Sequence, residues 1–213
     1  MLPYAPDVAR GSWSSDDYVE AWAADDVLDE LLAEPRRLTA ELVSEAERII
    51  DLGAGTGSYL AQLLEAFPAA SATWVDPSPR MRELAHERLG DRVTYVVGDI
   101  TSTDLDPADL VVTSRVVHDL PPETHAAFYS SAFELVRPGG FFFNLDHVAV
   151  PDGWGERYRR LRPRRSRSLA PHREHPLMPV SEHLARLAAA GFEPPDVPWR
   201  RFGTALLAAR RPA

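Results

Sequence analysis

The chain has 213 residues, of which 45% are hydrophobic and 26% are charged, and its formal net charge at pH 7 is −9. It contains no cysteine, which excludes disulfide bonds, cysteine-ligated zinc and a cysteine nucleophile. The acidic balance disfavours a general affinity for nucleic acid, because neutralising phosphates requires an excess of basic residues.

From Val43 onward, short apolar runs alternate with amphipathic stretches, a pattern typical of βα units in a parallel sheet. We predict strands over 48–52, 72–75, 93–97, 109–113, 141–145 and 204–209, and helices over 58–67, 78–89, 123–136 and 181–190. Ser78 should cap its helix, with Pro79 at the first position and Gly90 at the end. Residues 137–140 (RPGG) should turn the chain into the fifth strand, and 151–180 show no clear period. Residues 16–32 look helical and precede the repeating unit.

The most informative segment is IIDLGAGTGSYL, residues 49–60. Here a strand runs into a glycine turn and then a helix, at the sheet edge where α/β folds bind ligands. A dinucleotide fingerprint has the spacing GxGxxG, whereas Ser58 stands where its third glycine would be. Asp51 would repel a pyrophosphate but suits a ligand that carries an ammonium and a sulfonium group. S-adenosylmethionine is such a ligand.

Two further acids follow the next strands. Asp76 can accept hydrogen bonds from both hydroxyls of a ribose, and Pro77 and Met81 follow it and could flank an adenine. Asp99 can accept from an exocyclic amine while Ile100 packs on the ring. Each acid alone is better explained as a helix cap or turn residue, but three in register with the glycine turn favour a single site.

The segments DLGAGTG, WVDPSPRM, VVGDI, DLVVTSRVVHDLP and LVRPGGFFF resemble the motifs of class I (Rossmann-like) S-adenosylmethionine-dependent methyltransferases of the small-molecule type. The resemblance covers about residues 43–146, and the C-terminal AGFEPPDVPWRRFGTALLAARRP is similar to the family's final β-hairpin. It implies an α/β fold whose mostly parallel, seven-stranded sheet has an antiparallel last strand and is flanked by helices. It also implies S-adenosyl-L-methionine as cofactor, with Asp51, Gly53, Gly55 and Gly57 at its methionine end, Asp76 at the ribose, Asp99 and Ile100 at the adenine, and Ser114 and Arg115 on the methionine and acceptor side.

We expect a single domain, since no linker interrupts the chain. It divides into an N-terminal helical lid (1–42), a cofactor-binding core (43–150), a substrate-side insertion (151–180) and a C-terminal helix and hairpin (181–213). Tyr18 and Trp22 of the lid are expected on the substrate side, with core packing as the alternative. Residues 157–173 carry eight Arg, and Arg164 and Arg165 are candidates to recognise an acidic acceptor, unless the segment is simply a solvated flap.

Methyl transfer is an in-line displacement that depends mainly on alignment and desolvation, so a catalytic base is optional. His118 and His147, placed after the fourth and fifth strands, are candidate bases for a hydroxyl or amine acceptor, and each could equally be structural. Residues 114–117 lack the Asn/Asp-Pro-Pro-aromatic run of enzymes that methylate DNA bases or protein amides. Asn144 and Asp146 supply only part of a metal-ligand set. We therefore expect a metal-free methyltransferase that acts on an oxygen or nitrogen of a small molecule.

Three alternatives stay open from sequence: a nicotinamide oxidoreductase, a non-catalytic or regulatory protein that binds S-adenosylmethionine, and a tRNA-modifying relative. No stretch approaches the roughly 18 apolar residues of a membrane span, and the N-terminus lacks a secretion signal. We therefore expect a cytoplasmic protein with a small-molecule partner and no membrane contact, while the oligomeric state stays open.

Overall fold

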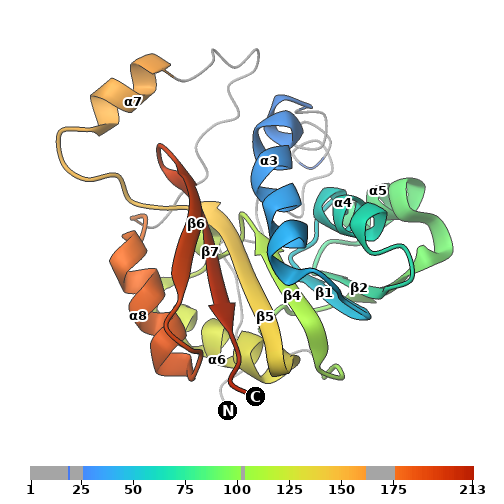
Figure 1. Ribbon diagram of the computed structural model, residues 1–213. Coiled ribbons are helices and arrows are strands. Elements are labelled where there is room, and N and C mark those ends of the chain that lie inside the picture. Colours follow the sequence, from blue (N-terminus) through green and yellow to red (C-terminus); the bar gives the residue numbers. More distant parts are fainter. Residues whose placement is uncertain (1–18, 20–25, 102–103, 162–175) are drawn as a thin grey trace.

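A computed structural model describes residues 19, 26–101, 104–161 and 176–213. Its seven-stranded sheet has the order β3-β2-β1-β4-β5-β7-β6 (Figure 1). The strands are β1 (Arg48–Leu52), β2 (Ser71–Asp76), β3 (Val93–Val97), β4 (Ala108–Ser114), β5 (Val136–His147), β6 (Asp196–Arg201) and β7 (Thr204–Arg210). Strands β1 to β5 pair in parallel, and β7 is antiparallel to both of its neighbours. The predicted sheet with an antiparallel last strand is confirmed.

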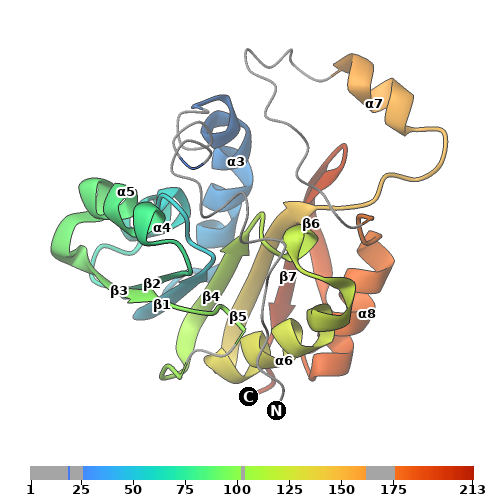
Figure 2. The same cartoon turned by 180° about the vertical axis from the view of Figure 1, so that it is seen from behind.

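Helices cover both faces of the sheet. The helices α3 (Asp26–Val43), α4 (Ser58–Ala66) and α5 (Pro79–Leu89) lie on one face, and α6 (His125–Leu135) and α8 (Val180–Ala190) lie on the other (Figures 1 and 2). Helix α7 (Gly155–Leu161) lies apart from both layers. Short 3₁₀ turns occupy Gly90–Arg92, Val117–Asp119 and Pro122–Thr124. Among the described residues, no helix combines the length and apolar character needed to cross a membrane.

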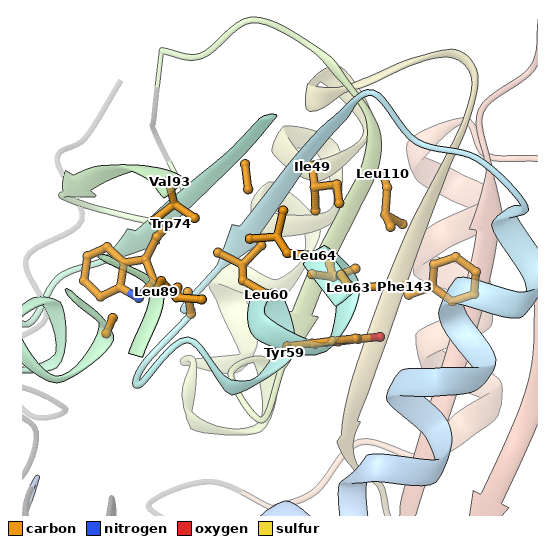
Figure 3. Packing of buried hydrophobic residues seen from close by; sticks show 14 of the residues in the cluster. Ile49, Tyr59, Leu60, Leu63, Leu64, Trp74, Leu89, Val93, Leu110 and Phe143 are labelled. Carbon is orange, nitrogen blue, oxygen red and sulfur yellow. The ribbon is translucent and has the colours of Figure 1, made fainter. Parts of the chain in front are cut away.

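Two buried hydrophobic clusters hold these layers together. The first lies between the sheet and the helices α4 and α5, and it includes Trp74, Leu60 and Leu89 (Figure 3). Trp74 is fully buried, yet its Nε1–H donates a 2.8 Å hydrogen bond to Gly55 O. The second cluster packs Phe128 and Leu187 against the opposite face. The glycine turn is therefore anchored directly in the hydrophobic core.

The predicted helix signals at 78–90 are confirmed. Ser78 Oγ accepts a 3.2 Å hydrogen bond from Met81 N, Pro79 opens the helix, and Gly90 caps its end at φ +58°. An N-cap hydroxyl satisfies a backbone donor that the first helical turn leaves without a partner.

The predicted turn at 137–140 is wrong, because these residues belong to β5. Between the pairs Ala108↔Val136 and Leu110↔Phe141, β5 advances five residues while β4 advances two. The extra residues form a bulge, with Gly139 at φ +79°. A Cβ on Gly140 would lie only 2.8 Å from Asp109 O, so the glycine pair permits close backbone contact rather than a chain reversal.

Two other segments also differ from the sequence-based expectation. The N-terminal helix α3 extends to Val43, well beyond the predicted 16–32, and residues 1–18 and 20–25 lie outside the described part. In the aperiodic segment 151–180, α7 forms with Tyr158 between Trp154 and Phe202, at ring-centroid distances of 5.6 and 5.2 Å. The helix contacts the β6–β7 turn through an aromatic side chain. Its sequence lacks the spacing of apolar residues that marks an amphipathic helix.

Candidate functional site

The glycine turn follows β1 at the carboxyl edge of the sheet. Gly53, Gly55 and Gly57 have φ values of +72°, +51° and +74°, a region that L side chains rarely adopt. A Cβ on Gly53 would also lie 2.3 Å from Val116 Cγ2, and one on Gly57 would lie 2.6 Å from Leu89 Cδ1. At these two positions the positive φ and the close side chains together disfavour any residue but glycine, independently of a ligand.

Asp51, at this edge, is 1% exposed. Neither carboxylate oxygen has a hydrogen-bond partner among the described residues. Burial raises the pKa of Asp51 to about 8, an effect that Arg36 opposes and Asp76 reinforces. A buried carboxyl group without a donor fits a ligand that brings a cationic N–H, such as the ammonium group of S-adenosylmethionine.

Sequence reasoning missed Arg36 on α3. This residue is 7% exposed, its guanidinium carbon lies 5.8 Å from the centre of the Tyr59 ring, and it acts electrostatically on Asp51. Tyr59 forms a 2.6 Å hydrogen bond with Thr39, one turn further along α3. The site therefore presents a carboxyl group and a guanidinium group that interact, a pair suited to the ammonium and carboxylate groups of an amino-acid ligand. An Arg among the apolar residues of an amphipathic helix was the signal that sequence reasoning could have used.

Asp76 ends β2 and is 8% exposed. Its Oδ2 accepts from Gly55 N at 3.0 Å and its Oδ1 accepts from Ser78 N at 2.9 Å. Burial raises the pKa of Asp76 to about 6 despite these two bonds. Each oxygen retains acceptor capacity for a further donor. Of the neighbours predicted to flank an adenine, Pro77 is exposed and Met81 is buried in the first core cluster.

Asp99 follows β3, and its Oδ1 accepts hydrogen bonds of 2.8 Å from both the N–H and the hydroxyl of Thr101. One oxygen of this carboxylate therefore stabilises a turn. Ile100 is 8% exposed and packs in the second cluster.

Ser114 and Arg115 stand at the end of β4. The buried hydroxyl of Ser114 makes no hydrogen bond within the described part of the chain. Arg115 has φ +62°, and its N–H donates to Leu145 O at 2.9 Å. Strained backbone of this kind is concentrated at functional sites.

The structure brings the two candidate bases together with Asp146, which is fully buried on β5. Nδ1 of His118 lies 2.5 Å from Asp146 Oδ1, and the His118 N–H donates to Oδ2 at 3.0 Å. His147 donates its backbone N–H to Oδ1 at 2.7 Å, and its ring meets the His118 ring edge to face at 4.8 Å. Burial raises the pKa of Asp146, but the charge and hydrogen bond of His118 outweigh this effect and bring it to about 2. Asp146 is therefore an ionised partner that orients His118.

Asp119 adds a second carboxylate to this pair, since its Oδ1 lies 3.2 Å from His118 Nε2. Among the described residues, no three His, Cys, Asp or Glu side chains form a group that could hold a metal ion. Asn144 and Asp146, which the sequence offered as part of a metal-ligand set, contact Tyr129 and His118, respectively. Tyr18, Trp22, Arg164 and Arg165 lie outside the described residues.

The chain is similar to proteins that contain a methyltransferase domain. Residues 49–140 match the model of a family described as methyltransferase domain. Over 135 residues the chain is 34% identical to trans-aconitate 2-methyltransferase of Methylobacterium radiotolerans. The aligned region covers 62% of this chain and 49% of that protein. It is 32% identical over 111 residues to carboxy-S-adenosyl-L-methionine synthase of Chromohalobacter salexigens, covering 49% of this chain and 41% of that protein.

The fold has a close counterpart among solved structures. Human N-acetylserotonin methyltransferase in complex with S-adenosylmethionine superposes with a TM-score of 0.73 at 19% identity, over 100% of this chain and 61% of that one. The chain spans about half or less of the length of the two curated relatives above. Its sheet order and these similarities show the Rossmann-like fold of class I S-adenosylmethionine-dependent methyltransferases. None of the three proteins named above is a nicotinamide oxidoreductase, the first of the alternatives that the sequence left open.

Proposed function

We propose that this protein transfers a methyl group from S-adenosylmethionine to a hydroxyl oxygen of a small molecule, with His118 as the group that removes the hydroxyl proton. The observation that carries this proposal is the buried pair of His118 and Asp146 at the carboxyl edge of the sheet, 2.5 Å apart. The names of the relatives describe different reactions, so they support the cofactor more strongly than the acceptor.

The cofactor side is proposed from the residues that surround the glycine turn. Asp51 would bind the ammonium group and Arg36 the carboxylate of the methionine end. Asp76 would bind the ribose, while Asp99 and Ile100 would hold the adenine. When bound, S-adenosylmethionine supplies a methyl group on a sulfonium, which is open to in-line displacement.

The proton step depends on the His118 ring. Because the carboxylate of Asp146 only accepts, Nδ1 of His118 carries a proton toward it. Nε2, which lies 3.2 Å from Asp119 Oδ1, is the nitrogen that would take the proton of the acceptor. The ionised Asp146 stabilises the positive charge that forms when Nε2 takes a proton. A hydroxyl would approach Nε2 beside Asp119. This arrangement therefore favours acceptors, such as hydroxyl compounds, that lose a proton when they are methylated.

His118→Gln tests the proposal. We expect kcat to fall by roughly 10²-fold or more while the dissociation constant of S-adenosylmethionine stays unchanged, because a base contributes about 10²–10⁴-fold. Formation of S-adenosylhomocysteine is measured with a panel of phenols, alcohols, carboxylic acids and amines. His147→Gln is the matched control, since it removes the neighbouring ring without removing the Asp146 pair. Equal losses in both variants would argue against His118 as the base, and cofactor binding without any turnover would support the non-catalytic alternative.

A further inference from the structure

Besides the pair of His118 and Asp146, the structure contains a buried polar cluster between the sheet and the helices α6 and α8. Asn144 of β5 is fully buried, and its Nδ2 donates a 3.1 Å hydrogen bond to the hydroxyl of Tyr129 on α6. The same hydroxyl lies 2.6 Å from Nδ1 of His183 on α8, which is 1% exposed. One chain of hydrogen bonds thus joins β5, α6 and α8.

The protons in this chain follow from the chemistry of each group. Burial raises the pKa of Tyr129, so the phenol keeps its proton. Since Asn144 Nδ2 can only donate, the phenol proton goes to His183 Nδ1. Burial lowers the pKa of His183 to about 4, against the opposing charge of Asp146. His183 is therefore neutral and carries its ring proton on Nε2.

The cluster is energetically costly as it stands. His183 Nε2 and Asn144 Oδ1 have no hydrogen-bond partner among the described residues. Buried polar atoms of this kind are uncommon, and an apolar layer between α6 and α8 would avoid their cost. Their presence indicates a role beyond packing.

Asn144 places the cluster on β5, the strand that carries Asp146, and α6, which carries Tyr129, also contacts the segment that follows His118. Asn144 and Asp146 are two residues apart on β5, so their side chains lie on the same face of the strand. His125, one helical turn before Tyr129 on α6, places Nε2 at 3.0 Å from Leu120 O. Leu120 directly follows the 3₁₀ turn that carries His118. Thus β5 and the His118 turn are each attached to α6 by a polar contact.

We propose that Tyr129, Asn144 and His183 are positioning residues that hold Asp146 in the orientation in which it orients His118. The inference rests on the proposed function of His118, because it concerns the same proton-transfer step. None of the three residues is proposed to contact cofactor or acceptor.

Tyr129→Phe tests this role, because it removes only the hydroxyl that joins Asn144 to His183. We expect the His118 ring ¹⁵N signals, assigned by their loss in His118→Gln, to move toward a mixture of tautomers. We expect kcat to fall about tenfold with an unchanged cofactor dissociation constant, since small displacements of catalytic groups slow reactions strongly. Leu187→Val is the control: it perturbs the same α6–α8 layer at an apolar, fully buried position and should lower Tm without moving the His118 signals or kcat.

The proposal is overturned if Tyr129→Phe changes the His118 signals and kcat no more than Leu187→Val does. If Tyr129→Phe does not fold, His183→Leu and His183→Gln decide. The Leu variant lacks an acceptor for the phenol and should reproduce the loss, while the Gln variant supplies one and should restore near wild-type signals and kcat. Absence of methyl transfer in the wild type would refute the proposed function, whereas the nuclear magnetic resonance comparison would still test the positioning role.

Discussion

The backbone N–H of Gly55 donates a 3.0 Å hydrogen bond to the carboxylate of Asp76, which joins the glycine turn after β1 to the end of β2. The N–H groups of Gly53 and Ala54 both donate to Val75 O, one residue earlier. The turn and the ribose-side acid are therefore held as one unit. A change at Asp76 should affect both the ligand contacts and the shape of the turn.

Asp76→Ala should weaken cofactor binding by about one to two powers of ten, because a buried charge-assisted hydrogen-bond acceptor is lost. Isothermal titration with S-adenosylhomocysteine measures the effect. Asp109→Asn is the control: Asp109 is also buried, but it accepts from Glu47 N and Arg48 N at the opposite edge of the sheet. It should lower stability and leave affinity intact. Unchanged affinity in Asp76→Ala would remove this residue from the site.

Asp51→Asn should raise the stability of the ligand-free protein at about pH 8 but not at about pH 4. The folded-state pKa of Asp51 is raised to about 8 from its ordinary value of 3.8. Between these values the folded state keeps a proton that the unfolded state releases, so the free energy of unfolding falls as pH rises through the window. An asparagine removes this dependence. Calorimetry at about pH 4 and at about pH 8 measures the difference in Tm between the variant and the wild type. Asp91→Asn, at an exposed position, is the control.

The same substitution should weaken cofactor binding, because the ammonium group favours an ionised Asp51. In the wild type, affinity should therefore rise with pH up to about pH 8, with proton release on binding. Titration in buffers of different ionisation enthalpy detects this release. A wild-type affinity that is flat with pH would contradict the assignment of Asp51.

Much of the fold could be predicted from the sequence because buried parallel strands are short apolar runs between turn residues. The bounds predicted for β1 and β3 are those observed, and β2, β4 and β7 differ by one residue at one or both ends. The edge strand β6 carries a proline and two arginines, and only the family resemblance indicated it. Helix α7 has no periodic signal, since its contacts are aromatic and come from a turn far along the chain.

The candidate site was predictable where function follows from local spacing, as in the glycine turn and the acid at the end of β2. Arg36 escaped because its partner Asp51 is 15 residues away, on another element. Tyr129 and His183 are 54 residues apart and meet only through the packing of α6 on α8. Side-chain partners across layers depend on packing, and the periodicity of one element does not specify them.

Replacing Arg164 and Arg165 with Ala should raise the KM for an acidic acceptor and leave cofactor affinity unchanged. The expectation follows from the Arg-rich sequence of this insertion, which leaves the carboxyl end of β5. Steady-state kinetics with acidic and neutral acceptors of similar size separate the effect, with the exposed Arg92→Ala as control. If the KM for the acceptor and the dissociation constant of the cofactor rose by the same factor, both residues would lie outside acceptor recognition.

Arg211→Ala should lower the free energy of unfolding by about 1–2 kcal/mol, because Arg211 satisfies the end of α6. Its Nη1 donates to Phe133 O and Val136 O, each at 2.9 Å, and its guanidinium carbon lies 4.3 Å from the Phe133 ring centre. Urea unfolding measures the change. Arg211→Lys keeps the charge but not the planar group that stacks on the ring, so its loss should be intermediate. Cofactor affinity should stay constant in both variants, since this contact lies at the amino end of β5, away from the site. A loss as large in Lys as in Ala would show that the planar guanidinium group, rather than its charge, makes the contribution.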